Sequence, residues 1–194
     1  MPPDGALQLP LGTTPFFHCA VCPIIAVLGS SRPAGNTRLL LDAVLAGRRA
    51  EVVDAQSYAP TPYDYQHRND ADLFLALTAR LVRTEVIVLA TPVYWYAMSA
   101  QMKCFFDRLS DLITIRKDLG RALAGRRVCL VATSTDPELP DGFTVPFVRT
   151  AEYFGLHWRG ALHARFDQDG VLTPDARGRA HGFAAAVFGP RPPA

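Results

Sequence analysis

Short apolar runs alternate with amphipathic segments along most of the chain. Three runs are continuously apolar, Ile24–Leu28, Val86–Ala90 and Val128–Ala132. This pattern is typical of strands that are buried on both faces of a parallel sheet. Two weaker runs, Glu51–Asp54 and Leu156–Ala164, predict a second and a fifth strand in chain order. The five strands predict a three-layer α/β domain, because a sheet of this kind needs helices on both faces.

The segments between these strands have the spacing of helices. In one of them, leucines recur at every fourth position, and Asn69 or Asp70 is placed to cap a helix that runs to Arg83. Ser99 is placed to cap a helix after the third strand. The other expected helices are Thr37–Ala46, Phe143–Phe154 and Pro174–Phe188. Between the second strand and about residue 69 we expect a loop that contains tyrosine and proline.

Right-handed crossovers leave few topologies for such a chain, and the commonest five-stranded order is 2-1-3-4-5. The 194 residues suffice for one well-buried domain and are few for two. We therefore expect a single domain over residues 23–190. Residues 1–22 are rich in proline and lack periodicity, which predicts a partly disordered N-terminal extension.

The charge balance narrows the class of partner. The chain has 20 basic and 18 acidic residues, a net charge of +2, and no long run of one sign. This gives no electrostatic reason to expect binding to nucleic acid or to a membrane surface. No apolar run approaches the roughly 20 residues that span a bilayer, and the N-terminal stretch lacks the positive region of a signal peptide.

The four cysteines do not suggest a disulfide framework or a metal site. Cys104 and Cys129 lie in hydrophobic segments and are expected to be small buried hydrophobic residues. His18, Cys19 and Cys22 lie close together, but a structural zinc site needs a fourth ligand. We therefore expect no metal and a reduced, cytoplasmic protein.

The loop after the first strand carries groups that suit an anion. It reads GSSRPAGNT over Gly29–Thr37 and opens the first helix. Unpaired backbone N–H groups at a helix start attract phosphate, and glycine allows the close approach that a Cβ would block. The side chains that can donate to an anion are those of Ser30, Arg32, Asn36 and Thr37.

Several kinds of phosphate chemistry do not fit this loop. A Walker loop has four residues between its glycines and then lysine, whereas here five residues separate Gly29 from Gly35 and Asn36 follows. The G-x-G-x-x-G fingerprint is absent, and there is no cysteine nucleophile of the phosphatase type. A terminal phosphate bound without chemistry fits best, which is how FMN is held. An ordinary polar turn that caps a helix is the alternative.

A second loop, Ala90–Ser99, follows the third strand and contains three consecutive aromatic residues. In the predicted sheet, the carboxyl ends of the first and third strands frame the ligand crevice. Aromatic residues there suit a flat ligand, so the two loops together favour a flavin. The alternative for the three aromatic residues is an oligomer interface or a small satellite core. Across the same edge, Ser134 and Thr135 offer hydroxyl and backbone groups for the polar side of a ring. Asp136 suits a turn cap better than contact with an anionic flavin.

Three motifs resemble those of the NAD(P)H-dependent FMN reductase family of flavodoxin-like flavoproteins. They are G-S-S-R-x-x-G-N-T at Gly29–Thr37, T-P-V-Y-W-Y-x-x-S-A-Q-M-K at Thr91–Lys103, and F-F-D-R at Phe105–Arg108. The resemblance covers about residues 24–165. It implies a flavodoxin-like fold, bound FMN, reduction by NADH or NADPH, and a homodimer or homotetramer.

The resemblance also implies roles for individual residues. Ser30, Arg32, Asn36 and Thr37 would bind the phosphate of FMN, and Pro92, Val93, Tyr94 and Trp95 would line its ring. Family members usually have glycine where this chain has Ser134, Thr135 and Asp136. No catalytic residue is predicted, because the flavin carries the chemistry.

The resemblance leads to an oxidoreductase whose acceptor is a small molecule such as a quinone or a flavin. A flavodoxin-type electron carrier is the main alternative, but such carriers tend to be strongly acidic and this chain has a net charge of +2. A domain that binds FMN without being an enzyme is another alternative. The sequence does not decide between NADH and NADPH.

Overall fold

The computed structural model describes residues 22–69, 72–167 and 169–190. Its sheet follows the order β2-β1-β3-β5-β6, and all four neighbouring pairs along this path are parallel. A short strand, β4, pairs antiparallel with β3 off the path. The strands are β1 (Ile24–Leu28), β2 (Ala50–Asp54), β3 (Val86–Tyr94), β4 (Ala97–Met98), β5 (Arg127–Ser134) and β6 (His157–Arg165). The predicted order of five parallel strands is confirmed, since the short β4 only shifts the numbering.

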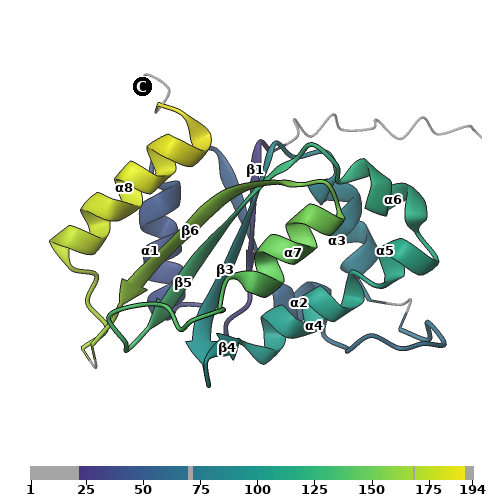
Figure 1. Ribbon diagram of the computed structural model, residues 1–194, viewed down its shortest axis with the longest axis horizontal. Coiled ribbons are helices and arrows are strands. Elements are labelled where there is room, and N and C mark those ends of the chain that lie inside the picture. The colour runs from purple at the N-terminus through teal and green to yellow at the C-terminus, as the bar shows by residue number, and fades with distance from the viewer. Residues whose placement is uncertain (1–21, 70–71, 168, 191–194) are drawn as a thin grey trace, which may run out of the picture.

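Helices cover both faces of the sheet (Figure 1). One face carries α1 (Asn36–Leu45) and α8 (Pro174–Phe188). The longer helices of the other face are α3 (Phe74–Leu81), α4 (Ala100–Arg108) and α7 (Val145–Tyr153). Three short helices complete the chain, namely α2 (Ala55–Tyr58), α5 (Asp111–Thr114) and α6 (Lys117–Ala122). The three-layer α/β architecture is therefore confirmed.

Two hydrophobic cores lie on either side of the sheet because successive side chains of a strand point to opposite faces. In β3, Ile87 and Leu89 join the core under α3, α4 and α7, whereas Val88 and Ala90 join the core under α1 and α8. Both sets are buried. The continuously apolar run that predicted this strand follows directly from its burial on both faces.

Some elements differ from the prediction. The helix expected from Asn69 or Asp70 begins at Phe74, where the carboxylate of Asp72 accepts the N–H of Phe74 at 3.1 Å. Asn69 instead donates to the carbonyl of Pro62 at 2.7 Å, and Asp70 lies outside the described residues. The loop expected between the second strand and residue 69 contains α2. Helices α5 and α6 and strand β4 were not predicted, because each is too short to show a period.

The two cysteines that were predicted to be buried differ in their exposure. Cys129 lies fully buried in β5, as predicted. Cys104 is only partly buried on α4, so the prediction of a buried hydrophobic residue is wrong for it. Cys19 lies outside the described residues. Within the part of the chain that the structure describes, no helix is long and apolar enough to cross a membrane.

Candidate functional site

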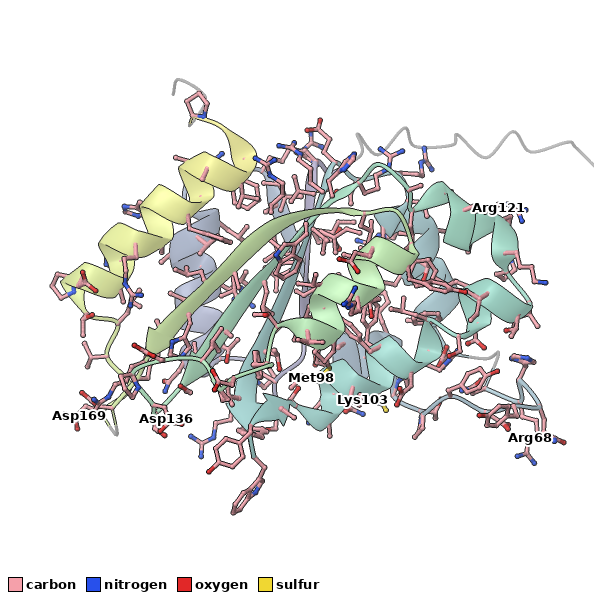
Figure 2. All side chains as sticks on the ribbon, in the orientation of Figure 1. Arg68, Met98, Lys103, Arg121, Asp136 and Asp169 are labelled. Carbon is pink, nitrogen blue, oxygen red and sulfur yellow. The ribbon has the colours of Figure 1, made fainter. Side chains whose placement is uncertain are left out.

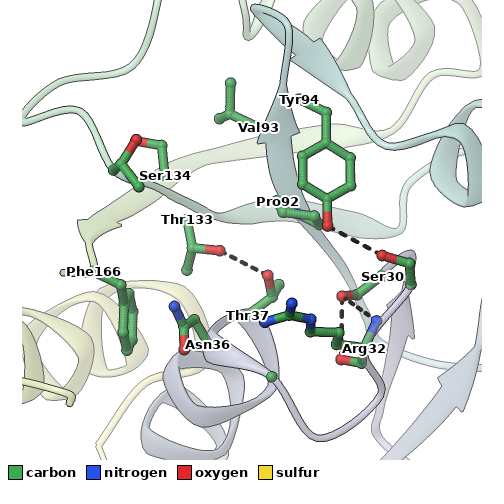
Figure 3. Close-up of a pocket in the computed structure, with 13 residues that line it drawn as sticks. Ser30, Arg32, Asn36, Thr37, Pro92, Val93, Tyr94, Thr133, Ser134 and Phe166 are labelled. Atoms are coloured by element: carbon green, nitrogen blue, oxygen red, sulfur yellow. Dashed lines mark hydrogen bonds between the residues drawn. The ribbon is translucent and has the colours of Figure 1, made fainter. Parts of the chain in front are cut away.

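A pocket lies where β1, β3 and β5 end. The register aligns these strand ends: Leu28 pairs with Ala90, and Pro92 pairs with Thr133. The pocket has a volume of about 500 Å³ (Figure 3), which is within the usual range for small-molecule sites. The residues that line it are Ser30, Ser31, Arg32, Gly35, Asn36, Thr37, Pro92, Val93, Tyr94, Thr133, Ser134, Thr135 and Phe166. Nine of the ten predicted binding residues thus come together, and Trp95 does not line this pocket.

The loop after β1 is folded back on itself by short-range hydrogen bonds. The hydroxyl of Ser30 donates to the carbonyl of Arg32 at 3.2 Å. The same hydroxyl accepts from the backbone N–H of Arg32, also at 3.2 Å. The N–H of Gly35 donates to the same carbonyl at 2.9 Å. A Cβ on Gly35 would lie only 3.0 Å from the Cβ of Arg32. The turn is therefore compact, and glycine at position 35 is what lets it close.

The N-terminus of α1 opens into the pocket without a protein cap. Gly35 occupies the N-cap position and provides no side-chain hydrogen bond, and no acidic residue lies in the first turn. The first N–H groups of a helix are unsatisfied unless a cap or a ligand accepts from them. Asn36 and Thr37 in this first turn line the pocket, so the helix start is available to an anion.

Arg32 gives the pocket a positive charge. It is exposed, and its guanidinium makes no hydrogen bond or ion pair with any described residue. Arg38, also in the first turn of α1, is by contrast paired with Asp42 at 2.8 Å. Among the described residues that line the pocket, Arg32 alone is charged. One free guanidinium beside an uncapped helix start suits a phosphate.

A buried pair of hydroxyls joins α1 to β5. The Oγ1 atoms of Thr37 and Thr133 lie 2.7 Å apart, and both side chains are buried (Figure 3). Because one hydroxyl hydrogen suffices for this contact, the other remains for a ligand. Of the other lining residues, Ser31 and Gly35 lie within the predicted loop Gly29–Thr37, and Thr133 begins the polar segment predicted to face the ring. Sequence reasoning missed Phe166, which directly follows β6 at the same edge of the sheet, and that position is the signal that could have found it.

Ser99 begins α4 as predicted. Its hydroxyl accepts the N–H of Met102 at 3.1 Å, and its own N–H donates to the hydroxyl of Thr91 at 3.0 Å.

Tyr94 reaches the loop after β1, with its hydroxyl 3.1 Å from that of Ser31 (Figure 3). The two loops that form the pocket are thus linked directly by side chains.

The aromatic residues form a tight hairpin between β3 and β4. Tyr94 pairs with Ala97, so Trp95 and Tyr96 are the two turn residues, with φ angles of 49° and 65°. Positive φ at both positions defines a type I′ turn, which normally takes Asn-Gly. Trp95 is 92% exposed and Tyr96 is 72% exposed. The prediction that Trp95 lines a flavin ring therefore gains no support from its position and stays a prediction.

The loop after β5 forms the opposite rim. Ser134 closes a turn in which its hydroxyl lies 3.1 Å from both the N–H and the carbonyl of Asp136. The serine makes this turn, whereas the carboxylate of Asp136 makes no hydrogen bond to a described residue. Figure 2 shows Asp136 and Met98 at the same end of the molecule, the end at which the strands terminate.

The chain matches known proteins along most of its length. Residues 22–138 match the model of a family described as NADPH-dependent FMN reductase. The Bacillus subtilis (strain 168) protein YwqN, provisionally named an NAD(P)H-dependent FMN-containing oxidoreductase, is 24% identical over 162 residues, which cover 78% of this chain and 90% of YwqN.

Solved structures show the same fold. The Trp repressor binding protein from Bacillus subtilis superposes with a TM-score of 0.66 at 21% identity, covering 81% of this chain and 94% of its own. A WrbA-like flavodoxin from Agrobacterium tumefaciens gives a TM-score of 0.60 at 18% identity, with coverages of 85% and 94%. The flavodoxin-like fold is therefore confirmed.

Proposed function

Because the chain belongs to the NADPH-dependent FMN reductase family, we propose that it passes electrons from NADH or NADPH through bound FMN to a small acceptor. A quinone or a free flavin is the acceptor class that we favour. The observation that carries the proposal is the meeting of Gly29–Thr37 and Pro92–Tyr94 in one pocket. An anion site beside a wall of Pro92, Val93 and Tyr94 suits the two ends of FMN.

The residues present fit the phosphate of FMN. The uncapped start of α1, the unpaired guanidinium of Arg32 and the compact turn closed by Gly35 form a cradle for an anion. We propose that Ser30, Arg32, Asn36 and Thr37 hold the phosphate. Ser30 uses its hydroxyl hydrogen within the loop, so it would help to hold the phosphate through the shape of the turn, whereas Arg32, Asn36 and Thr37 would contact it with their side chains.

The other lining residues suit the flavin ring. When bound, FMN supplies the hydride-accepting and electron-donating chemistry. Pro92, Val93 and Tyr94 form one wall of the pocket, and Tyr94 is anchored by its hydroxyl to Ser31. We propose that this wall orients the ring and excludes water from one face, while Thr135 contacts its polar side. No protein acid or base is assigned to the transfer from nicotinamide.

The exposed hairpin supports a role at the mouth of the site. Large exposed aromatic side chains mark surfaces that bind a ligand or another chain, and Trp95 and Tyr96 are two such side chains next to each other at the pocket's edge. We propose a homodimer or homotetramer in which this hairpin is covered. A single domain over residues 23–190, with residues 1–22 as an extension, and a cytoplasmic location stay predictions from the sequence.

One experiment separates the proposed reductase from its alternatives. The purified protein, supplied with FMN, should be yellow and should bleach anaerobically when NADH or NADPH is added. Stable yellow colour with both nucleotides would favour an electron carrier. A colourless protein that takes up no FMN would refute the proposal. Steady-state rates with a quinone and with free flavin then distinguish the two acceptor classes.

A further inference from the structure

His163 lies next to a residue of the pocket without lining the pocket itself. It is half-buried on β6, and its Nε2 atom lies 2.8 Å from the hydroxyl of Ser134 at the end of β5. The same hydroxyl contacts the N–H and the carbonyl of Asp136, each at 3.1 Å. Three polar groups thus surround one hydroxyl, which has one hydrogen and two lone pairs.

Counting hydrogens gives the arrangement in which all three contacts are hydrogen bonds at once. The N–H of Asp136 can only donate to Ser134, and the carbonyl of Asp136 can only accept from it. The single hydroxyl hydrogen therefore points to that carbonyl. Nε2 of His163 must then donate, because an acceptor at this position would compete for the same hydrogen. All three contacts are satisfied only when His163 carries a hydrogen on Nε2.

The surroundings of His163 favour its neutral form. Burial lowers the pKa of His163, the positive charge of Arg179 on α8 lowers it further, and the carboxylate of Asp136 opposes the shift. Arg179 also donates to the backbone carbonyl of His163 at 3.2 Å. Because the neutral Nε2–H tautomer and the protonated ring both donate from Nε2, the bond to Ser134 does not depend on the charge of the ring.

The three contacts of the Ser134 hydroxyl determine which groups remain for a ligand. Ser134 has no hydroxyl hydrogen left, so it cannot donate into the pocket. Thr135, the next residue, is exposed and lines the pocket, and neither its N–H nor its hydroxyl bonds to a described residue. Figure 3 shows Ser134 across the pocket from Arg32. The free donors of this rim thus lie away from the phosphate cradle.

We infer that His163 is a positioning residue for the flavin site: by donating to Ser134 it fixes the turn that presents Thr135 to the ring of FMN. The inference rests on the proposed function. It gives a role to a half-buried histidine that lies beside the pocket without lining it. It also replaces the sequence-based expectation that the hydroxyl of Ser134 contacts the ring directly.

Titration of the FMN-free protein with flavin tests the inference. We expect His163→Ala to weaken the binding of both FMN and riboflavin roughly tenfold, about the effect of one lost hydrogen bond. His163→Gln, whose amide N–H can donate to Ser134, should stay within about threefold of the wild type. His157→Ala is the matched control, because His157 is exposed at the other end of β6. The visible spectrum of bound FMN should shift in His163→Ala and return in His163→Gln.

The outcomes are distinct. Unchanged flavin affinity in a folded His163→Ala protein, or equal losses in His163→Ala and His163→Gln, would overturn the inference. A loss confined to FMN would also overturn it, because it would place the effect at the phosphate. If His163→Ala does not fold, Thr135→Val removes the exposed hydroxyl and should still weaken both flavins; unchanged affinity there counts against the inference. Failure of the wild type to bind FMN would instead refute the proposed function.

Discussion

The hydroxyl of Ser99 donates to the backbone carbonyl of Gly29 at 2.6 Å, although 70 residues separate them. Ser99 is fully buried and also caps α4 by accepting the N–H of Met102. A Cβ on Gly29 would lie 2.7 Å from the Cβ of Met102 and 2.8 Å from its backbone nitrogen. The absence of a side chain at position 29 therefore lets the start of α4 press against the end of β1. This contact sets the relative position of the two loops that line the pocket.

We expect Ser99→Ala to lower both stability and flavin affinity. The substitution removes a helix cap and leaves the buried carbonyl of Gly29 without this donor, so we expect a loss of about 2 kcal/mol in the free energy of unfolding. Ser110→Ala is the matched control, because Ser110 precedes α5 without a side-chain cap; its effect should stay below about 0.5 kcal/mol. Urea unfolding of both variants measures the difference, and equal values would contradict the role assigned to Ser99.

The strands and the pocket could be predicted because their signals are local. The buried strands are continuous apolar runs, and the nine predicted lining residues lie between β1 and the first turn of α1 or at the carboxyl ends of β3 and β5. The hairpin was missed since Trp95-Tyr96 is not a usual turn sequence, and positive φ at two aromatic residues contradicts local preference. The contact of Thr37 with Thr133 depends on pairing across the sheet, which no single-sequence pattern reveals.

Arg32→Ala should separate the binding of FMN from that of riboflavin. The guanidinium has no partner among the described residues and lines the pocket, so its removal should leave the fold intact. A lost charge-assisted hydrogen bond of about 2 kcal/mol weakens FMN binding by roughly thirtyfold, while riboflavin, which lacks the phosphate, should bind as before. Arg38→Ala, which removes a surface pair with Asp42, serves as the control. Equal losses for both flavins in Arg32→Ala would place Arg32 away from the phosphate.

Arg108 should be essential for stability although it lies outside the pocket. Its side chain is buried, donates to Asp111 at 2.7 Å and pairs with Asp72. Arg108→Met would leave these carboxylates without their buried counter-charge, which should cost about 3–5 kcal/mol in the free energy of unfolding. Lys103→Met removes only the exposed pair with Asp107 and should cost less than about 1 kcal/mol. Chemical unfolding compares the two, and similar values would contradict the buried-pair argument.

Cys129 should make the protein sensitive to high pH. Burial raises the pKa of its thiol from 9.0 to about 12, with a smaller opposing effect of Arg127. Since the folded-state pKa is the higher one, the stabilising contribution is complete below the unfolded-state value of 9.0 and is lost as the pH rises toward about 12. Relative to Cys129→Val, the wild type should lose about 2 kcal/mol between pH 8 and about pH 10.5. Urea unfolding with reductant at both pH values measures this, and parallel pH profiles would refute it.

Replacing Trp95 and Tyr96 in the hairpin should make the protein more stable and less active. Both residues adopt positive φ, which costs about 1–2 kcal/mol for a residue with a side chain. Trp95→Asn combined with Tyr96→Gly supplies the sequence that a type I′ turn prefers. Because both side chains are exposed, little packing is lost, so the free energy of unfolding should rise by about 1 kcal/mol or more. The same variant should turn over nicotinamide and acceptor more slowly, or dissociate into smaller species if the hairpin lies between subunits.

Tyr153→Ala tests whether removing any exposed aromatic residue raises stability. Tyr153 is a suitable control because it is exposed on α7 with ordinary helical geometry. It should not gain stability, since no backbone strain is relieved there. Thermal unfolding, steady-state rates and light scattering on the same samples separate the three expectations. A hairpin variant that is more stable and fully active would show that the aromatic turn serves neither substrate nor partner. A variant that is less stable would show that the side chains of Trp95 and Tyr96 are packed in the functional form. That result would contradict the prediction that relieving the positive φ angles stabilises the protein.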